Sequence, residues 1–95
     1  MSLARVVLFD GVTADRAAQL QQQLSEGDPP EGLKATELMI LSNPSAEQAL
    51  AIVFFDTEDD YRSGDAILGA MPTDDTPGSR TSVTRYDVLV RRSVT

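Results

Sequence analysis

Residues Ala49–Phe55 form an uninterrupted run of seven apolar residues that stops at Asp56. The short length, the β-branched and aromatic content and the abrupt polar boundary favour a strand over a helical segment. A strand that is apolar at every position is covered on both faces. A chain of 95 residues is too short to cover both faces of a sheet by itself. We therefore expect the second face to pack against another copy of the chain.

Five other segments complete the predicted fold. Two threonines, Thr13 and Thr57, are each followed by acidic residues, which is the usual pattern at the start of a helix. Arg5–Phe9 is a second strand without polar alternation. The predicted elements, in order, are a strand at Arg5–Phe9, a helix from Thr13 to about Ser25, a strand at Leu33–Leu41, the strand Ala49–Phe55, a helix from Thr57 to about Met71 and a strand at Thr81–Arg91.

This β-α-β-β-α-β order indicates an α+β protein with the ferredoxin-like arrangement, a four-stranded antiparallel sheet with two helices on one face. Its middle strands would be the first and the third, which are the two without polar alternation. Four strands spaced about 4.8 Å apart span roughly 19 Å. Two helices about 10 Å wide cover that width on one face only. An exposed apolar patch of this size usually marks an interface, so we expect a homodimer formed through the sheet.

Residue spacing also predicts which side of each element lies between the helices and the sheet, which we call the inner side. In the first helix Ala17, Leu20 and Leu24 share one face, whereas the glutamines around Gln21 take the rest. The remaining inner residues are expected to be Tyr61, Ile67, Leu68 and Met71 on the second helix, Leu38 and Ile40 on the second strand, and Tyr86, Val88 and Val90 on the last strand.

Composition narrows the classes of function. The net charge of −7 disfavours binding to nucleic acid and to anionic membrane surfaces. No apolar run approaches the roughly 20 residues that span a bilayer, and no secretory leader is visible. We expect one domain over residues 1–95, located in the cytoplasm. Arg91 and Arg92 at the end of the last strand either pair with an acidic residue of a second subunit or protect the sheet edge from further pairing.

The sequence offers little for metal or cofactor chemistry. Without histidine or cysteine, serine hydrolase triads, thiol enzymes and the usual zinc sites are excluded or nearly so. No glycine-rich phosphate loop is present. Asp56, Glu58 and Asp60 have the first spacings of a calcium loop, but Tyr61 replaces its glycine and Ile67 replaces its bidentate acid. We expect no cofactor and no metal, and interpret these acids as helix-capping residues.

Glu37, Arg85 and Asp87 form the first candidate site. If Tyr86 points toward the helices, alternation places Arg85 and Asp87 on the opposite face of the sheet, together with Glu37. An arginine between two carboxylates could fix an acidic or enolic ligand, or tune a carboxylate as a general base. The more ordinary interpretation is an ion-pair network that sets the register of the dimer.

Tyr61 is the centre of the second candidate site, with Arg62 and Asp65 beside it on the second helix. In a functional interpretation these residues form the mouth of a pocket. Gly64 would then allow a ligand to approach the helix closely. In the alternative interpretation Tyr61 packs its ring at the edge of the core and keeps its hydroxyl in water.

The stretches Phe54–Tyr61 and Arg85–Val88, together with the element order, resemble small bacterial members of the dimeric α+β barrel superfamily. That superfamily includes antibiotic-biosynthesis monooxygenases and muconolactone isomerases. The resemblance covers the whole chain. It implies two sheets packed face to face and a cavity between sheet and helices that holds a ligand.

Three functions remain open from the sequence. The first is a homodimer that binds a small apolar or acidic molecule between sheet and helices, with no assigned reaction. The second is a cofactor-free monooxygenase or isomerase acting on a hydrophobic enolisable compound, in which Arg85 stabilises the anion and Asp87, Glu37 or Tyr61 moves the proton. The third is a structural module whose cavity is filled by side chains. Whether the protein is an enzyme stays undecided at this level.

Overall fold

The computed structural model describes residues 2–27, 30–70 and 78–94, which contain four strands, two α-helices and one 3-10 turn. The order predicted from the sequence is confirmed. The elements are β1 (Leu3–Asp10), α1 (Ala14–Glu26), β2 (Glu37–Asn43), η1 (Pro44–Ala46), β3 (Gln48–Phe55), α2 (Glu58–Gly69) and β4 (Ser79–Asp87).

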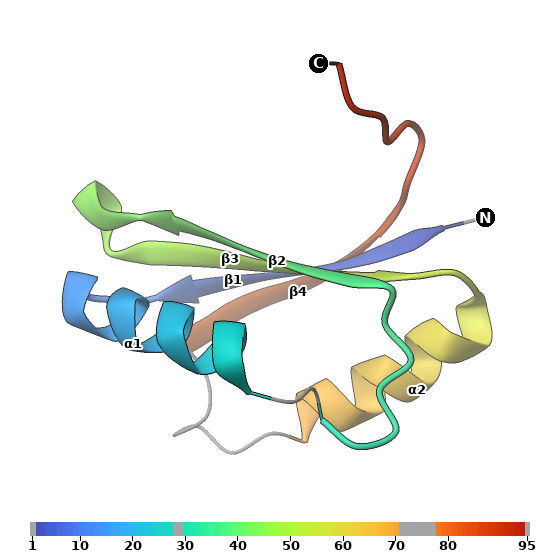
Figure 1. Cartoon of the computed structure of the whole chain (residues 1–95), viewed down its shortest axis with the longest axis horizontal. Helices are drawn as coiled ribbons and strands as arrows, with labels where there is room; N and C mark the ends of the chain where they lie inside the picture. Colours follow the sequence, from blue (N-terminus) through green and yellow to red (C-terminus); the bar gives the residue numbers. More distant parts are fainter. Residues whose placement is uncertain (1, 28–29, 71–77, 95) are drawn as a thin grey trace.

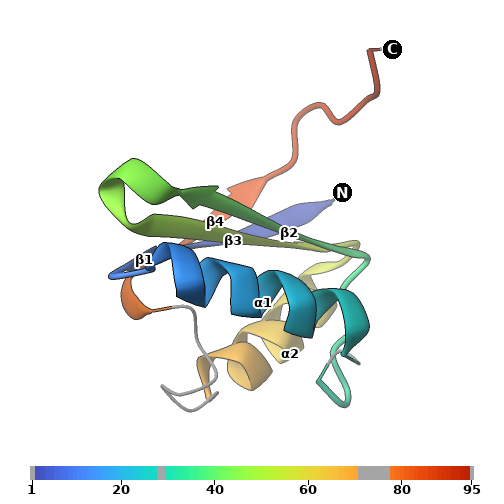
Figure 2. The ribbon, with the colours of Figure 1, turned by 60° about the vertical axis from the view of Figure 1, so that its left-hand side comes forward.

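The strands form one antiparallel sheet in the order β2-β3-β1-β4, which is the ferredoxin-like arrangement. The two strands without polar alternation, β1 and β3, lie in the middle, as predicted. Both helices lie on the same side of the sheet, and among the described residues the other side carries no helix (Figure 1). The same two layers are visible in the turned view (Figure 2). We call the side away from the helices the open face.

Both helices begin where the threonines predict. The Thr13 side chain accepts a hydrogen bond from the Arg16 amide at 3.2 Å, and that of Thr57 accepts one from the Asp60 amide at 3.1 Å. Each cap satisfies one of the amides that the first turn of a helix leaves without a partner. Gly27 follows α1 as its C-cap. The end predicted for α2, at Met71, lies outside the described residues.

The helix-facing side of the sheet holds the core. In β1 the odd-numbered residues point toward the helices, and in β3 their register partners do the same, with Val7 opposite Ala51 and Leu3 opposite Phe55. Phe55 is completely buried. The core divides into two clusters, Leu3, Val53, Phe55 and Tyr61 beside α2, and Val7, Phe9, Val12 and Ala49 beside α1.

The inner side of β4 was predicted wrongly. Register places Arg85 opposite Arg5 and Val83 opposite Val7, so these residues of β4 face the helices. Tyr86 pairs with Ala4 on the open face and is 56% exposed. Pairing with β1 decides the direction of β4, because one register step turns every side chain of a strand to the other face. The strand also ends at Asp87 rather than Arg91.

Strand β2 begins four residues later than predicted, at Glu37. Leu33 and Ala35, which were predicted as its first part, pack instead against the cluster that contains Phe55. The predicted alternation of β2 is confirmed by its register: Leu38 and Ile40 lie opposite the helix-facing Val53 and Ala51.

Residues 88–94 follow β4 without forming a helix or strand, and we call them the arm. The arm rises from the sheet on the side away from the helices (Figures 1 and 2). The Val88 amide donates a hydrogen bond to the Ser2 carbonyl at 2.9 Å. The Arg91 guanidinium lies 4.0 Å from the centroid of the Phe54 ring and forms an ion pair with Glu37.

In the part of the chain that the structure describes, neither helix has the length and apolar character needed to cross a membrane.

Candidate functional site

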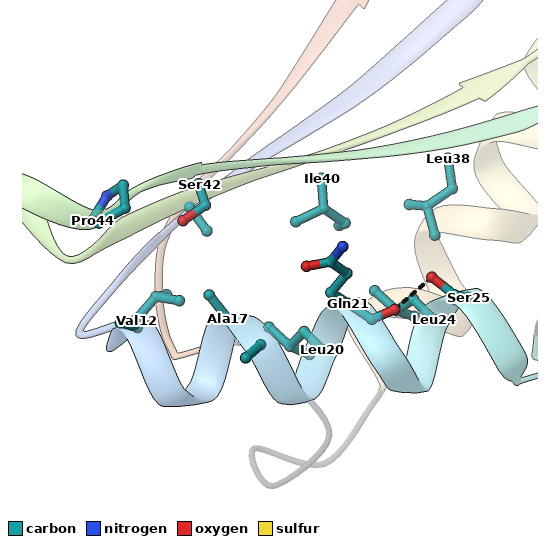
Figure 3. A pocket seen from close by; sticks show the side chains of 13 residues that line it. Val12, Ala17, Leu20, Gln21, Leu24, Ser25, Leu38, Ile40, Ser42 and Pro44 are labelled. Atoms are coloured by element: carbon teal, nitrogen blue, oxygen red, sulfur yellow. Dashed lines mark hydrogen bonds between the residues drawn. The ribbon is translucent and has the colours of Figure 1, made fainter.

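A cavity of about 600 Å³ lies between α1 and β2. Figure 3 shows the helix as its floor and the strand as its roof, with side chains from both pointing into the space between them. Its lining residues are Val12, Ala14, Ala17, Ala18, Leu20, Gln21, Leu24, Ser25, Leu38, Ile40, Ser42, Pro44 and Ala49.

The cavity exists because small side chains line the part of α1 that faces β2. Ala14, Ala17 and Ala18 project only a methyl group toward the strand, so they leave the space above the first turns of the helix open. Leu24 and Leu38 lie at the other end of the cavity and stay exposed. The sequence predicted that Leu24 shares a face of the helix with Ala17 and Leu20, and the lining of the cavity confirms this, although Leu24 stays exposed.

The polar groups of the cavity are neutral. Figure 3 shows the Gln21 amide extending between α1 and Ile40, toward the strand. The hydroxyl of Ser25 donates to the Gln21 backbone carbonyl at 2.6 Å, and Ser42 lines the opposite wall. The sequence grouped Gln21 with the outer residues of the helix, whereas its side chain lines the cavity. None of the lining residues that the structure describes is charged.

A second polar cluster lies on the other half of the helix-facing side, between α2 and the strands β1 and β4. Arg5 is only 4% exposed, and its Nε donates to Oδ1 of Asp65 at 2.8 Å. The neighbouring Arg85 donates to Oε1 of Glu58 at 3.0 Å. Arg5 and Arg85 are therefore each paired with an acid of α2, as a charge close to an apolar core requires.

Tyr61 lies between these two ion pairs. Its ring meets Phe55 edge to face, with centroids 5.5 Å apart, and the Arg85 guanidinium lies 5.3 Å from its centroid. Burial raises the pKa of the Tyr61 hydroxyl above its ordinary value. Tyr61 is thus a packed, protonated phenol at neutral pH, which agrees with the core-edge interpretation.

The pKa of Glu58 is shifted in the opposite direction from that of Tyr61. Its hydrogen bond from Arg85, with a further contribution from the charge of Arg62, lowers the pKa of the carboxyl group below its ordinary value. The Arg62 guanidinium lies 3.6 Å from the same carboxylate oxygen of Glu58, one helical turn away. Glu58 is therefore a fixed anion that holds Arg85 in place.

The fold separates the three residues of the first candidate site. Arg85 and Asp87 lie on β4 and face the helices, whereas Glu37 lies on β2, at the opposite edge of the sheet, and faces the other way. Glu37 pairs with Arg91 of the arm instead. The prediction that Glu37 shares a face with Arg85 and Asp87 is wrong. Of the four candidates, the structure brings together only Arg85 and Tyr61.

The sequence suggested that Gly64 allows a ligand to approach α2, whereas the structure places the core next to this residue. A Cβ atom at this position would overlap the Phe55 ring and press on Leu33. The missing side chain therefore lets α2 approach the sheet, and the close contact is with the core.

Two features were missed by the sequence analysis. The first is the partner of Arg5: a buried arginine in an apolar strand needs a counter-charge, and the half-exposed Asp65 supplies it. The cavity was expected only from the family resemblance. The alanines at positions 14, 17 and 18, on the side of α1 near β2, were its available signal.

Within the described residues, no group of three or more acids could hold a metal ion. No family model matches the chain, and no curated protein matches it. The structure defines this protein as a ferredoxin-like α+β protein with a mainly apolar cavity between α1 and β2.

Proposed function

We propose that this protein binds a small, mainly apolar and uncharged molecule in the cavity between α1 and β2. The observation that carries the proposal is the cavity itself, about 600 Å³ with a largely apolar lining. Ligand sites in proteins commonly measure about 300–1,000 Å³ and combine apolar walls with a few polar groups. The Gln21 amide and the Ser42 hydroxyl supply such groups here.

The lining favours an uncharged ligand over the acidic one that the sequence left open. A carboxylate buried without a cation loses its hydration without compensation, and no arginine or lysine lines this cavity. The net charge of −7 also repels anions. The amide of Gln21 both donates and accepts hydrogen bonds, so it suits a hydroxyl, carbonyl or amide group on the ligand.

The proposal includes no reaction. Of the two carboxylates that the enzyme hypothesis combined with Arg85, Glu37 lies on the opposite face of the sheet, whereas Asp87 shares the face of Arg85. Tyr61 packs on Phe55 in the core, and Arg85 is paired with Glu58. No observation favours a proton transfer at these residues over a structural role.

The proposal also includes a homodimer formed through the open face, as in the dimeric α+β barrels that the sequence resembles. The support for this assembly is the apolar character of the face, to which each strand contributes. Its large apolar residues are Val6, Leu8, Met39, Leu41, Leu50, Ile52, Phe54 and Tyr86. Moving a large apolar side chain from full exposure to full burial contributes roughly 1.5–3 kcal/mol, and each of these residues contributes in proportion to the area that it still exposes.

The ligand proposal is tested by titrating the protein with 1-octanol, octanoate and octylammonium and following backbone amide shifts. We expect saturable shifts with 1-octanol at residues of α1 and β2, and at least tenfold weaker binding of the two ions. Ala17→Leu and Ser42→Val fill the cavity from opposite walls and should weaken binding at least tenfold.

Ala66→Leu is the matched control, since it adds the same side chain as Ala17→Leu at an exposed position of α2 outside the cavity. It should leave the affinity unchanged. Shifts that do not saturate, or saturating shifts that map away from α1 and β2, would contradict the proposed site.

A further inference from the structure

The arm presents apolar side chains to solvent from a fixed base. Leu89, Val90 and Val94 are 95%, 75% and 89% exposed, more than any large apolar residue of the sheet. The base is held by the hydrogen bond from Val88 to Ser2 and by Arg91 on Phe54 and Glu37. Scattered apolar residues on a surface are ordinary, but a group of them on one anchored segment marks a contact with another molecule.

The direction of the arm selects the partner. The arm leaves the molecule on the side of the open face (Figures 1 and 2), where the second copy of the proposed homodimer would lie. In a two-fold dimer each copy would offer one arm and receive one, so the contact forms twice.

The distribution of charge along the chain also favours a second copy as the partner of the arm. Residues 88–95 contain Arg91, Arg92 and no acidic residue, so they carry +2. Residues 1–87 therefore carry −9, since the whole chain carries −7. A basic arm is attracted to the acidic body of a second copy, whereas that same acidity repels the whole molecule from an anionic membrane.

We infer that the arm is exchanged between subunits, with Leu89, Val90 and Val94 packed on the second copy. The inference rests on the homodimer proposed above and goes beyond it, because it assigns part of the interface to a segment outside the sheet. Exchange of an identical element is a low-cost route to a dimer. Arg91 and Phe54 then orient the arm at the point where it leaves its own sheet.

The test measures the dimer dissociation constant by analytical ultracentrifugation for the full chain and for the variant Leu89→Glu/Val94→Glu. Both side chains are exposed in the single chain, so the fold of each subunit should persist, which circular dichroism checks. We expect the dissociation constant to rise at least tenfold. The control Gln22→Glu/Gln23→Glu adds the same charge on exposed positions of α1 and should change it less than twofold.

A mixed dimer of ¹³C-labelled and unlabelled chains gives the second measurement. Isotope-filtered spectra should show contacts from the methyl groups of Leu89, Val90 and Val94 to the other subunit. A dimer without such contacts, or one equally weakened by the control, would overturn arm exchange while leaving the homodimer intact. A full chain that is monomeric at micromolar concentration would overturn the homodimer and the exchange together.

Discussion

At Gly64 the backbone of α2 lies close to the sheet. The Phe55 ring, itself completely buried, occupies the space that a side chain at position 64 would need. In the middle of an exposed helix a glycine costs about 1 kcal/mol relative to alanine. Here the cost is offset by the close contact of the helix with the core.

We therefore expect Gly64→Ala to destabilise the protein by about 1–3 kcal/mol, the usual range for overpacking a core. Gly69→Ala is the control in the same helix, because nothing lies within 4 Å of the added carbon. It should stabilise the protein by up to about 1 kcal/mol. Denaturant unfolding of both variants measures the two changes in the free energy of unfolding. Equal effects of the same sign would show that helix propensity, rather than contact with Phe55, decides the result.

At the scale of elements, α2 and β4 are connected by the Arg85–Glu58 pair. This pair explains why the face of the sheet on which each β4 side chain lies could not be predicted from the residues of β4 alone. The strand alternates Val83 and Arg85 with Thr84 and Tyr86, so neither side is clearly apolar. The decisive partners, Arg5 on β1 and Glu58 on α2, lie far away in the sequence. By contrast, β1 and β3 were placed correctly because their own residues are apolar on both sides.

The pair also predicts a pH effect. Arg85 lowers the pKa of Glu58 in the folded state, so the pair contributes stability above the ordinary carboxyl pKa of 4.5. That contribution is lost as the pH falls through the folded-state value. NMR titration of the Glu58 carboxyl carbon should give a midpoint below 4.5, which Arg85→Ala should move toward 4.5. Arg62→Ala should move it less, because its contribution is smaller; a larger effect of Arg62 would contradict this assignment.

The cavity, like the facing of β4, depends on contacts between segments that are far apart in the sequence. The sequence correctly predicted that Leu38 and Ile40 face the helices and that Ala17 and Leu20 face the sheet. Whether two such faces touch depends on the distance between α1 and β2, which no local pattern encodes. Gln21 lies beside the inner row of the helix, and it became a lining residue because the helix stands away from the strand.

For the whole molecule, the helix layer consists of two unequal halves. On one side α2 packs directly on β1 and β3 through Tyr61 and Gly64, and on the other the cavity separates α1 from β2. Elements with few packed contacts open at lower free energy than the core. The fold should therefore be least stable at α1.

Hydrogen exchange under native conditions measures this difference. We expect the amides in the middle of α1 to exchange at least tenfold faster than those in the middle of α2, because opening α1 exposes less apolar surface. A bound ligand should slow the exchange of α1 and leave α2 nearly unchanged. Equal protection of the two helices without ligand would contradict this view of the helix layer.

The register shift in β4 decides on which side of the sheet Arg80 lies. Leu8 pairs with Ser82 and Phe9 with Arg80, so Thr81 is an additional residue, and its hydroxyl donates to the Leu8 carbonyl at 3.0 Å. The extra residue turns Arg80 toward the helices, where its guanidinium donates to the Leu68 carbonyl near the end of α2. Without this shift Thr81 would pair with Phe9 and Arg80 with Asp10, which would bring a cation to the side of the sheet where Leu8 and Val6 lie. The additional residue in β4 therefore keeps the Arg80 guanidinium away from Val6 and Leu8.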